Sequence, residues 1–579
     1  VHVDTGGTFT DCLVEAPDGS IGRAKALSRG TLPGVVREIL GPREIRIEAA
    51  WDAPDELPVG FGLRFPSQPG FSGEVASYES SSRKLSLSDD FPFSPKEGEP
   101  LELDSGLEAP ILAARLALSS FGRELADAEV AMRLATTRCT NALLEGKGTA
   151  PVFFVTRGFR DLLRIGDQRR LGLFDLKPRK REPLHCEVVE VPERMDRDGK
   201  VLEPIDLDAL RPEVQRLCGE GRRVAAVSLL HSYLNPDHEN SLSSFLKEEG
   251  FSVVATSASI HPFFRWLPRA ESAVVEAYLD PVLRDYLENV STSLSGGSLR
   301  VMTSAGGLVG KDSYRSVDSL LSGPAGGVVG AASVARRVGI DEAIALDMGG
   351  TSADVSRFDG DFDYCDRHEV GDALVSAPAL RIETVAAGGG SICRVEGDLL
   401  IVGPESAGAR PGPACYGFGG PLCLTDVNLL LGRLSVEHFA APVFPKEAER
   451  RLKQLLDSCG RSREETLLGF LEVADDAMAG AIRKVSVREG YDPADYALVA
   501  FGGAGGQHAC GVAEKLGISR ILSPADAGLL SAYGLSKATL ERFAERQVLR
   551  LLEEVDLPVL LDELADEAVA SLDLEASGG

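Results

Sequence analysis

The spacing of apolar residues along the chain predicts helices and strands in alternation. Apolar residues recur at helical intervals over 108–121, 265–290 and much of 447–490. Short, nearly continuous apolar runs bounded by turn residues occupy 151–156, 224–231, 301–304 and 496–501. Runs of this length are typical of strands buried in a sheet, whereas helical patterns run longer. Strands that alternate with helices indicate an α/β fold.

Residues 42–104 carry a different pattern, in which apolar and polar residues alternate. Alternating segments separated by Pro, Gly, Ser and Asp lie at 44–50, 61–65, 73–78 and 84–87. Alternation of this kind is typical of strands with one buried face. We therefore expect a small β-domain inserted into the first part of the α/β fold, as a spacer or docking module. The segment before it, 25–40, is expected to lead toward a helix.

Two distant segments repeat one pattern, Asp-x-Gly-Gly-Thr-x-x-Asp, after a short apolar run. The first copy occupies residues 4–11 and the second 347–354, and an Asp-Gly pair follows each of them. The pattern predicts a strand, a glycine turn, a second strand and an Asp-Gly hairpin. One copy alone is as typical of an ordinary tight turn as of a binding site. Two copies in the same context favour a pair of phosphate-binding hairpins.

The residue types in these turns fit a polyphosphate and its metal. Glycines let backbone N–H groups approach an anion without obstruction by a Cβ atom, and the Thr hydroxyl adds a donor. Carboxylate oxygens suit a divalent cation, so Asp4 and Asp347 are predicted metal ligands. Asp11 and Asp354 are candidates for catalysis, by positioning or proton transfer, although an Asp that closes a turn is often structural. The predicted phosphate contacts are Gly6, Gly7, Thr8, Thr10, Gly349, Gly350, Thr351 and Ser352.

A third glycine turn follows the strand predicted at 496–501. It consists of Gly502, Gly503, Ala504 and Gly505, and it opens a helix. Backbone amides at such a helix start suit the adenosine or α-phosphate end of a nucleotide. The Gly-x-x-x-x-Gly-Lys-Ser/Thr and Gly-x-Gly-x-x-Gly patterns are both missing, which weakens the two commoner nucleotide-binding alternatives.

Two segments dense in Gly and Pro, 385–392 and 403–417, are predicted loops. Loops on a rigid scaffold often carry function. For the two charged candidates in the second loop, a structural ion pair is the alternative. The candidate substrate contacts are Gly389, Gly390, Ser391, Glu405 and Arg410.

Two other segments have mainly structural interpretations. His231 ends the strand predicted at 224–231, and we favour a satisfied core or strand-end residue there. Residues 322–331 are rich in small side chains and predict a helix that packs closely against its neighbours.

The composition of the chain limits which binding partners and which cellular compartment we expect. A net charge of -27 and a pI near 4.8 argue against nucleic acid or an anionic membrane as the main partner. The ten cysteines are scattered without a Cys-x-x-Cys pair, so we expect reduced thiols and a cytoplasmic protein. No apolar run is long enough to span a bilayer, and no signal peptide is recognisable. The chain opens inside a strand without Met, so we expect a few native residues to be missing.

The twin hairpins resemble those of the actin, heat-shock-chaperone and sugar-kinase superfamily of ATPases, in which two related, ribonuclease H-like lobes each supply one phosphate hairpin. Longer segments narrow the resemblance to the hydantoinase A/5-oxoprolinase family. These segments lie at 136–145, 156–161, 231–236, 322–331, 386–391, 403–417 and 501–510. The resemblance covers nearly the whole chain apart from the β-insert. It implies an A-type part, which handles ATP. The sequences of two loops, 386–391 and 502–510, are most similar to the 5-oxoprolinase branch.

The resemblance also implies a reaction and its participants. The family hydrolyses cyclic amides, such as 5-oxoproline or a hydantoin, with ATP and Mg²⁺. Phosphorylation of the carbonyl oxygen makes an imidate-like electrophile from an unreactive lactam, and water can then attack it. A B-type part completes ring opening in the family. We therefore expect a B-type partner, separate or fused, and an oligomer.

The resemblance and the patterns together divide the chain. We expect a first lobe at 1–41 and 105–320, the β-insert at 42–104, and a second lobe at 321–540. A C-terminal helical segment at 541–579 is expected to be incomplete.

Two residues depart from the family pattern, and two other functions stay open. Ala353 stands where the family usually has Thr, and Glu383 stands where it commonly has His. The alternatives are the ATP-binding subunit of an acetone-carboxylase-like enzyme and an ATP-gated scaffold of the actin or chaperone type. A third small subunit encoded nearby would favour the carboxylase. Nucleotide-dependent assembly without lactam-stimulated hydrolysis would favour the scaffold.

Overall fold

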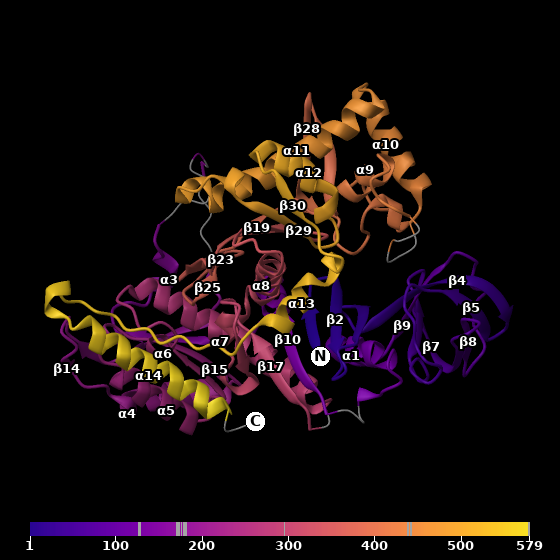
Figure 1. Cartoon of the computed structure of the whole chain (residues 1–579). Helices are drawn as coiled ribbons and strands as arrows, with labels where there is room; N and C mark the ends of the chain where they lie inside the picture. The colour runs from indigo at the N-terminus through magenta and orange to yellow at the C-terminus, as the bar shows by residue number, and fades with distance from the viewer. Residues whose placement is uncertain are drawn as a thin grey trace.

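The computed structural model shows a mixed α/β protein built around several sheets (Figure 1). It describes residues 1–125, 129–168, 174, 176–177, 182–294, 296–436, 439 and 443–576. All ten cysteines are free thiols, as predicted. In the described part of the chain, no helix has the length and apolar character needed to cross a membrane.

The first sheet has twelve strands and contains the N-terminal hairpin. Its α/β part has the order β18-β17-β10-β1-β2-β3, and β1, β10 and β17 run parallel. The bounds of these strands are β1 His2–Thr5, β2 Phe9–Glu15, β3 Ile21–Leu27, β10 Ala131–Thr136, β17 Ser298–Met302 and β18 Leu308–Gly310. Helices α1 (Ala109–Ser119) and α7 (Trp266–Thr292) confirm the helical patterns at 108–121 and 265–290.

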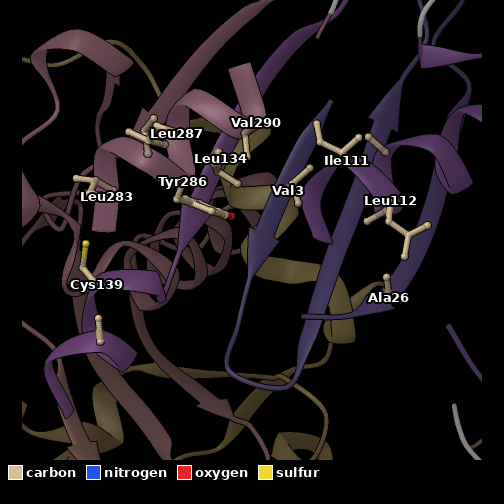
Figure 2. Packing of buried hydrophobic residues seen from close by; sticks show 14 of the residues in the cluster. Val3, Ala26, Ile111, Leu112, Leu134, Cys139, Leu283, Tyr286, Leu287 and Val290 are labelled. Atoms are coloured by element: carbon tan, nitrogen blue, oxygen red, sulfur yellow. The ribbon is translucent and has the colours of Figure 1, made fainter. Parts of the chain in front are cut away.

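Apolar side chains from both helices bury the centre of this sheet. Figure 2 shows Val3 of β1 between Ile111 of α1 and Tyr286 and Val290 of α7. Val3 and Val290 are fully buried, and Ile111 and Tyr286 nearly so. The strand that enters the first glycine turn therefore packs against both helices, which helps to fix where the turn lies.

The rest of the first sheet curls into a small β-barrel. Its strands are β4 Thr31–Gly41, β5 Glu44–Glu48, β6 Gly62–Phe65, β7 Gln68–Glu79, β8 Lys84–Leu87 and β9 Pro100–Asp104. Strand β4 pairs with both β5 and β9, which closes the ring. The alternating segments predicted within 42–104 are strands, as expected.

The expectation of a helix after 25–40 is wrong. The segment contains the end of β3 and nearly all of β4, so the barrel begins at Thr31 rather than at residue 42. Leu32, Gly34 and Val36 are buried in alternation, which is the period of a strand.

A separate four-stranded parallel sheet has the order β12-β11-β15-β16. Its strands are β11 Val152–Thr156, β12 Glu187–Val191, β15 Val224–Ser228 and β16 Val253–Thr256. Helices α4 (Leu207–Gly219) and α5 (Asp237–Glu248) contribute apolar residues to its core. The apolar runs at 151–156 and 224–231 are thus strands, although β15 ends at Ser228, before His231.

The second large sheet contains the other hairpin. Its path is β21-β20-β19-β29-β30, and β26 pairs with β20. The strands are β19 Glu342–Met348, β20 Ala353–Asp359, β21 Asp361–Phe362, β26 Glu383–Val385, β29 Ala497–Phe501 and β30 Arg520–Leu522. The helices around its core are α9 Leu424–Leu430, α10 Pro445–Cys459, α11 Arg463–Val485 and α12 Gly505–Leu516. Both loop predictions need correction at their ends. Residue 385 ends β26, residues 391–392 begin β27 (Ser391–Glu396), and residues 403–406 belong to β28 (Leu399–Ser406), which pairs with β27.

Two helices, α8 (Ser322–Arg337) and α13 (Leu530–Lys537), lie between the two large sheets (Figure 1). They cross through glycines: a Cβ atom on Gly534 would lie 1.9 Å from the Gly326 carbonyl oxygen. The close-packing helix predicted at 322–331 is confirmed. At the chain end, α14 (Leu557–Ala576) agrees with the predicted helical segment.

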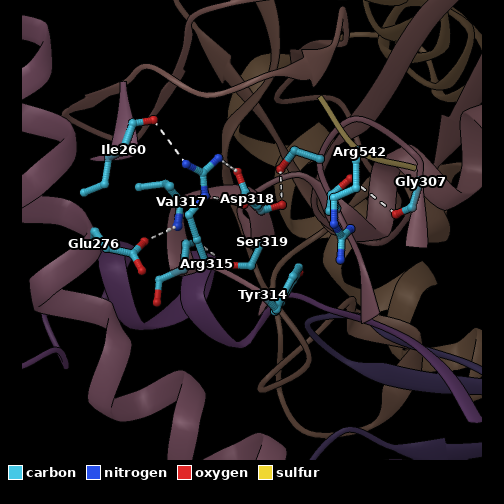
Figure 3. A network of polar contacts seen from close by, with 12 residues as sticks. Ile260, Glu276, Gly307, Tyr314, Arg315, Val317, Asp318, Ser319 and Arg542 are labelled. Atoms are coloured by element: carbon cyan, nitrogen blue, oxygen red, sulfur yellow. Dashed lines mark hydrogen bonds and ion pairs between the residues drawn. The ribbon is translucent and has the colours of Figure 1, made fainter. Parts of the chain in front are cut away.

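A partly buried polar network fixes the turn that leads into α8 (Figure 3). Arg315 donates to the Ile260 carbonyl at 3.1 Å and to both carboxylate oxygens of Asp318 at 2.7 and 2.8 Å. Glu276 of α7 accepts a hydrogen bond from the Val317 N–H at 2.8 Å. The start of α8 is thereby tied to α7.

Glu276 should make stability depend on pH. Burial raises its pKa from 4.5 to about 7. A folded state that holds this proton more tightly loses stability as pH rises from 4.5 to about 7, by up to about 3 kcal/mol. In the Glu276→Gln variant, which keeps an acceptor for Val317, unfolding measured across this range should lose that slope. A variant with the same slope as the natural chain would contradict the assignment.

Candidate functional site

The two Asp-x-Gly-Gly-Thr segments form the same backbone structure. In the first hairpin Asp4 pairs with Asp11 across β1 and β2, and the Gly6 N–H donates to the Phe9 carbonyl at 3.0 Å. In the second, Asp347 pairs with Asp354 across β19 and β20, and an equivalent bond joins Gly349 to the Ser352 carbonyl at 3.0 Å. The predicted strand, glycine turn and strand are therefore confirmed in both copies.

The tips of both turns are open. Gly7 and Gly350 are exposed, and a Cβ atom added to either would meet no atom within 4 Å. Thr351 is also exposed, and Thr8 and Ser352 are half-buried. Backbone N–H groups in such turns can approach an anion directly.

Thr10 lies apart from the other predicted phosphate contacts. It is fully buried, and its hydroxyl lies 3.2 Å from the Ser28 hydroxyl, which donates to the Gly6 carbonyl at 2.7 Å. This chain of contacts braces the turn from inside. Ala353, at the equivalent position of the second hairpin, is also fully buried. The departure from Thr at this position thus removes a buried group and leaves the turn tip unchanged.

The two hairpins converge on one face of helix α8. A Cβ atom on Gly323 would lie 3.3 Å from Asp4 Oδ1, and one on Gly327 would lie 3.3 Å from Asp347 Oδ2. Residues four apart lie on the same side of a helix, one turn from each other. The carboxyl groups of Asp4 and Asp347 are therefore neighbours along α8, although their strands belong to different sheets.

The electrostatics of these carboxyl groups agree with that arrangement. Burial raises the pKa of Asp4 to about 7, with a further contribution from Asp11, while Lys25 and a hydrogen bond from Ser531 oppose the rise. Burial also raises the pKa of Asp347 well above its usual range, and Asp354, Asp4 and Asp11 add to the effect. Carboxylates from both hairpins thus raise the pKa of Asp347, so the two hairpins lie close enough to interact electrostatically.

Asp4 and Asp347 fit a Mg²⁺ ion that is bound together with phosphate groups. Asp4 Oδ1 is shielded from solvent and has no hydrogen-bond partner among the described residues. Within those residues, no group of three or more His, Cys, Asp or Glu side chains is arranged to hold a metal on its own. Mg²⁺ is usually bound through one or two carboxylates plus substrate phosphates and water, which is the donor set that this pair offers.

Asp11 and Asp354 have partners that sequence reasoning missed. Lys25 Nζ lies 2.5 Å from Asp11 Oδ1, and the Thr384 hydroxyl donates to Asp354 Oδ1 at 2.6 Å. Both partners stand opposite their aspartate in the strand register. Lys25 was not predicted as a partner because its segment was expected to lead toward a helix. Thr384 directly follows Glu383, the residue that stands where the family commonly has His. Glu383 itself forms an ion pair with Lys484 of α11.

The triple-glycine loop packs directly against the second hairpin. The Gly389 N–H donates to the Gly349 carbonyl at 3.0 Å, and the Gly390 N–H donates to the Gly350 carbonyl at 2.6 Å. A Cβ atom on Gly388 would lie 2.5 Å from the Thr351 carbonyl carbon, so the loop needs glycine there. Two of the predicted substrate contacts are thereby brought to the turn.

The other predicted substrate contacts behave differently. Ser391 is fully buried, and its hydroxyl accepts the Gly388 N–H at 2.9 Å, so it closes the loop from inside. Glu405 is exposed and pairs with Arg394 at 2.5 Å. The exposed Arg410 lies 5.1 Å from the ring centre of Phe418. Within the described residues, no contact joins Glu405 or Arg410 to either hairpin.

The third glycine turn also lies against the second hairpin. The Ala504 N–H donates to the Met348 carbonyl at 2.9 Å. Gly502 has a φ of 80°, and a Cβ atom there would lie 2.3 Å from Asp347 Oδ1. Gly503 is exposed, whereas Ala504 and Gly505 are buried. The turn that opens α12 therefore stands beside Asp347.

Comparisons with known proteins identify the family of this chain. The family model for the hydantoinase/oxoprolinase N-terminal region matches residues 97–250, and the hydantoinase/oxoprolinase model matches 269–543. The 5-oxoprolinase PfmaA of Pestalotiopsis fici is 43% identical over 71% of this chain, which spans 35% of that relative. Caprolactamase subunit alpha of Pseudomonas jessenii is 31% identical over 77% of this chain and 67% of its own length. The chain belongs to the hydantoinase/oxoprolinase family.

Two solved structures share the fold. The ATP-dependent caprolactamase of Pseudomonas jessenii superposes with a TM-score of 0.70 at 27% identity, over 90% of this chain and 77% of that one. A nucleotide-free acetone carboxylase gives a TM-score of 0.72 at 23% identity, over 99% of this chain and 76% of that one. The second likeness shows the fold alone. This chain spans only about a third of the length of the 5-oxoprolinase relative.

Proposed function

We propose that this chain is the ATP-handling part of an ATP-dependent hydrolase of cyclic amides. The observation that carries the proposal is the convergence of Asp4 and Asp347 on Gly323 and Gly327 of α8. This convergence supports a single nucleotide site to which both hairpins contribute residues. The family membership, the 5-oxoprolinase relative and the ATP-dependent caprolactamase support a lactam as the second substrate.

In this proposal the two large sheets are the cores of the two lobes of an actin-like ATPase. The first lobe comprises residues 1–30 and 105–320, with the barrel of β4 to β9 as the insert. The second lobe comprises 321–540, and the C-terminal segment follows. Helices α8 and α13 pack between the lobes, so they are placed to carry relative movement of the two hairpins.

The chain's own residues have defined roles in the proposed reaction. Backbone N–H groups of the two turns and the Thr8, Thr351 and Ser352 hydroxyls bind phosphate oxygens. Because these donors are fixed before the nucleotide arrives, they stabilise charge that develops during phosphoryl transfer. The turn at 502–505 receives the adenosine end.

The carboxylates complete the site. Asp4 and Asp347 would hold Mg²⁺, which neutralises phosphate charge when it is bound with ATP. Lys25 holds Asp11 and Thr384 holds Asp354, so each of these two carboxylates is oriented at the edge of the turns. Either can position an attacking group or accept its proton. The transferred phosphoryl group goes to the lactam carbonyl oxygen, and ADP leaves.

Ring opening is assigned to a B-type partner, separate or fused. The test is phosphate release from the chain co-expressed with its B-type part, measured with 5-oxoproline, hydantoin and caprolactam. At least one lactam should stimulate phosphate release well above the rate without lactam. Asp398→Ala, in the exposed turn between β27 and β28, is a control variant and should behave like the natural chain. ATP-dependent assembly with no stimulation by any lactam would favour the scaffold instead.

A further inference from the structure

The four-stranded parallel sheet has a topological switch point of its own. The chain passes from β11 outward to β12 on one side, and from β15 outward to β16 on the other. The connections therefore diverge between β11 and β15. In open parallel α/β sheets, ligands bind outside the carboxyl ends of the strands at such a point. The nucleotide hairpins belong to the other two sheets, so this edge lies outside the nucleotide site proposed above.

A buried arginine stands at this edge with two of its three nitrogens unpartnered among the described residues. Arg269, near the start of α7, is 0% exposed. Its Nη1 donates to the Ser232 hydroxyl at 2.5 Å and to the Ser257 hydroxyl at 3.1 Å. Its Nε and Nη2 have no hydrogen-bond partner among the described residues. The Nε–Nη2 edge of a guanidinium is a fork that matches the two oxygens of a carboxylate.

The nearby protein carboxylate does not fill that fork. Glu239 accepts hydrogen bonds from the Leu229 N–H at 2.8 Å, the Ser257 hydroxyl at 2.7 Å and the Ala258 N–H at 2.9 Å. It therefore reaches Arg269 only through Ser257. Burial lowers the pKa of Arg269, and Glu239 opposes this effect. A buried charge without a direct partner is costly, so a bound anion would relieve the site.

The turn after β15 adds specific features to the same place. His231 has a φ of 59°, which is a strained conformation for a residue other than glycine. Ser232 holds Arg269, and the Tyr233 ring centre lies 5.4 Å from the guanidinium. Burial and the charge of Arg269 lower the pKa of His231, while Asp196 and Glu193 oppose the effect. Strain of this kind persists where surrounding contacts enforce it, and it clusters at binding sites.

We propose that Arg269 and the turn formed by His231, Ser232 and Tyr233 bind a small carboxylate anion at the switch point of the four-stranded sheet. The two free guanidinium nitrogens take the two carboxylate oxygens, and the Tyr233 ring covers the guanidinium. The ligand is either a ring acid such as 5-oxoproline, a choice that rests on the proposed function, or any small carboxylate. Both carry the carboxylate group that the fork binds.

Calorimetric titration of the whole chain tests the site, with sodium 5-oxoprolinate, sodium acetate and uncharged hydantoin at constant ionic strength. Carboxylate binding should saturate, and hydantoin should not compete with it. Binding of 5-oxoprolinate alone identifies a ring acid, whereas equal binding of acetate identifies a general carboxylate site. Absence of saturable binding of either carboxylate would overturn the proposal, since water alone would then satisfy Arg269.

Arg269→Lys keeps the charge but loses the fork, and it should weaken carboxylate binding by about tenfold or more. Arg284→Lys is the matched control on the same helix. All three nitrogens of Arg284 have partners already, so carboxylate affinity should not change. Equal affinity in Arg269→Lys and the natural chain would contradict the assignment.

Hydrogen exchange on the natural chain covers the case in which Arg269→Lys fails to fold. Carboxylate should protect the amides of 229–234 and leave those of 349–352 unchanged. Protection at the hairpins instead would place the carboxylate elsewhere and overturn the site. Mg²⁺-ATP binding, measured separately, reports on the nucleotide site, so failure of one proposal is distinguishable from failure of the other.

Discussion

Replacement of Asp347 by asparagine should abolish ATP turnover by the complete enzyme without unfolding the chain. Asn cannot supply the negative charge that would hold a cation beside Asp4, and loss of one such fixed electrostatic group costs about a hundredfold or more in rate. Burial and neighbouring carboxylates raise the pKa of Asp347 well above its usual range, so the charge itself destabilises the fold. The Asp347→Asn variant should therefore be at least as stable as the natural chain.

The measurement is phosphate release together with thermal unfolding, and Asp4→Asn should behave in the same way. Asp361→Asn, at an exposed position on β21 of the same sheet, is the control and should leave both quantities unchanged. Turnover within a few fold of the natural rate in either hairpin variant would refute the metal roles of Asp4 and Asp347. Loss of activity accompanied by unfolding would show a structural role instead.

Replacement of Gly502 by alanine should disrupt the second hairpin. The backbone at Gly502 has a φ of 80°, which an L side chain rarely adopts. The new Cβ atom would lie 2.3 Å from Asp347 Oδ1 and 2.6 Å from the Met348 carbonyl oxygen, and the carbonyl belongs to a central strand that cannot move freely. We expect a loss of about 2 kcal/mol or more in unfolding free energy, and weaker ATP binding.

Gly503→Ala provides the matched comparison for stability. A Cβ atom there meets nothing within 4 Å, and the residue is exposed. Its unfolding free energy, measured with denaturant, should stay close to that of the natural chain. If Gly502→Ala were as stable as Gly503→Ala and bound ATP equally well, the close approach of the third glycine turn to Asp347 would be wrong.

The hairpins could be predicted from the sequence because their signals are local. An apolar run, two glycines and a second apolar run specify a strand, a turn and a strand whatever the rest of the chain does. The repeat of the pattern then indicated a shared ligand. The third turn was predictable for the same reason, since Gly502 to Gly505 directly follow a buried strand.

The partners of the aspartates were not predictable, because they depend on register between strands. Lys25 faces Asp11 only when β3 is known to pair with β2, and the apolar pattern of 25–40 had been interpreted as leading to a helix. Gly323 and Gly327 were seen as close-packing residues, but nothing in their spacing identifies Asp4 and Asp347 as the groups packed against them. The partner of Glu405 was not predictable for the same reason. It is Arg394, on the strand paired with that of Glu405, and the Gly- and Pro-rich sequence had been interpreted as a loop rather than a strand.

The central claim is that the two hairpins close on one triphosphate. The most direct measurement is a crystal structure of the chain with Mg²⁺ and a non-hydrolysable ATP analogue. We predict phosphate oxygens within hydrogen-bond distance of backbone N–H groups from both 6–8 and 349–352, with the metal between Asp4 and Asp347. A nucleotide that touches one hairpin alone, or that binds elsewhere while both turns face solvent, would contradict the claim.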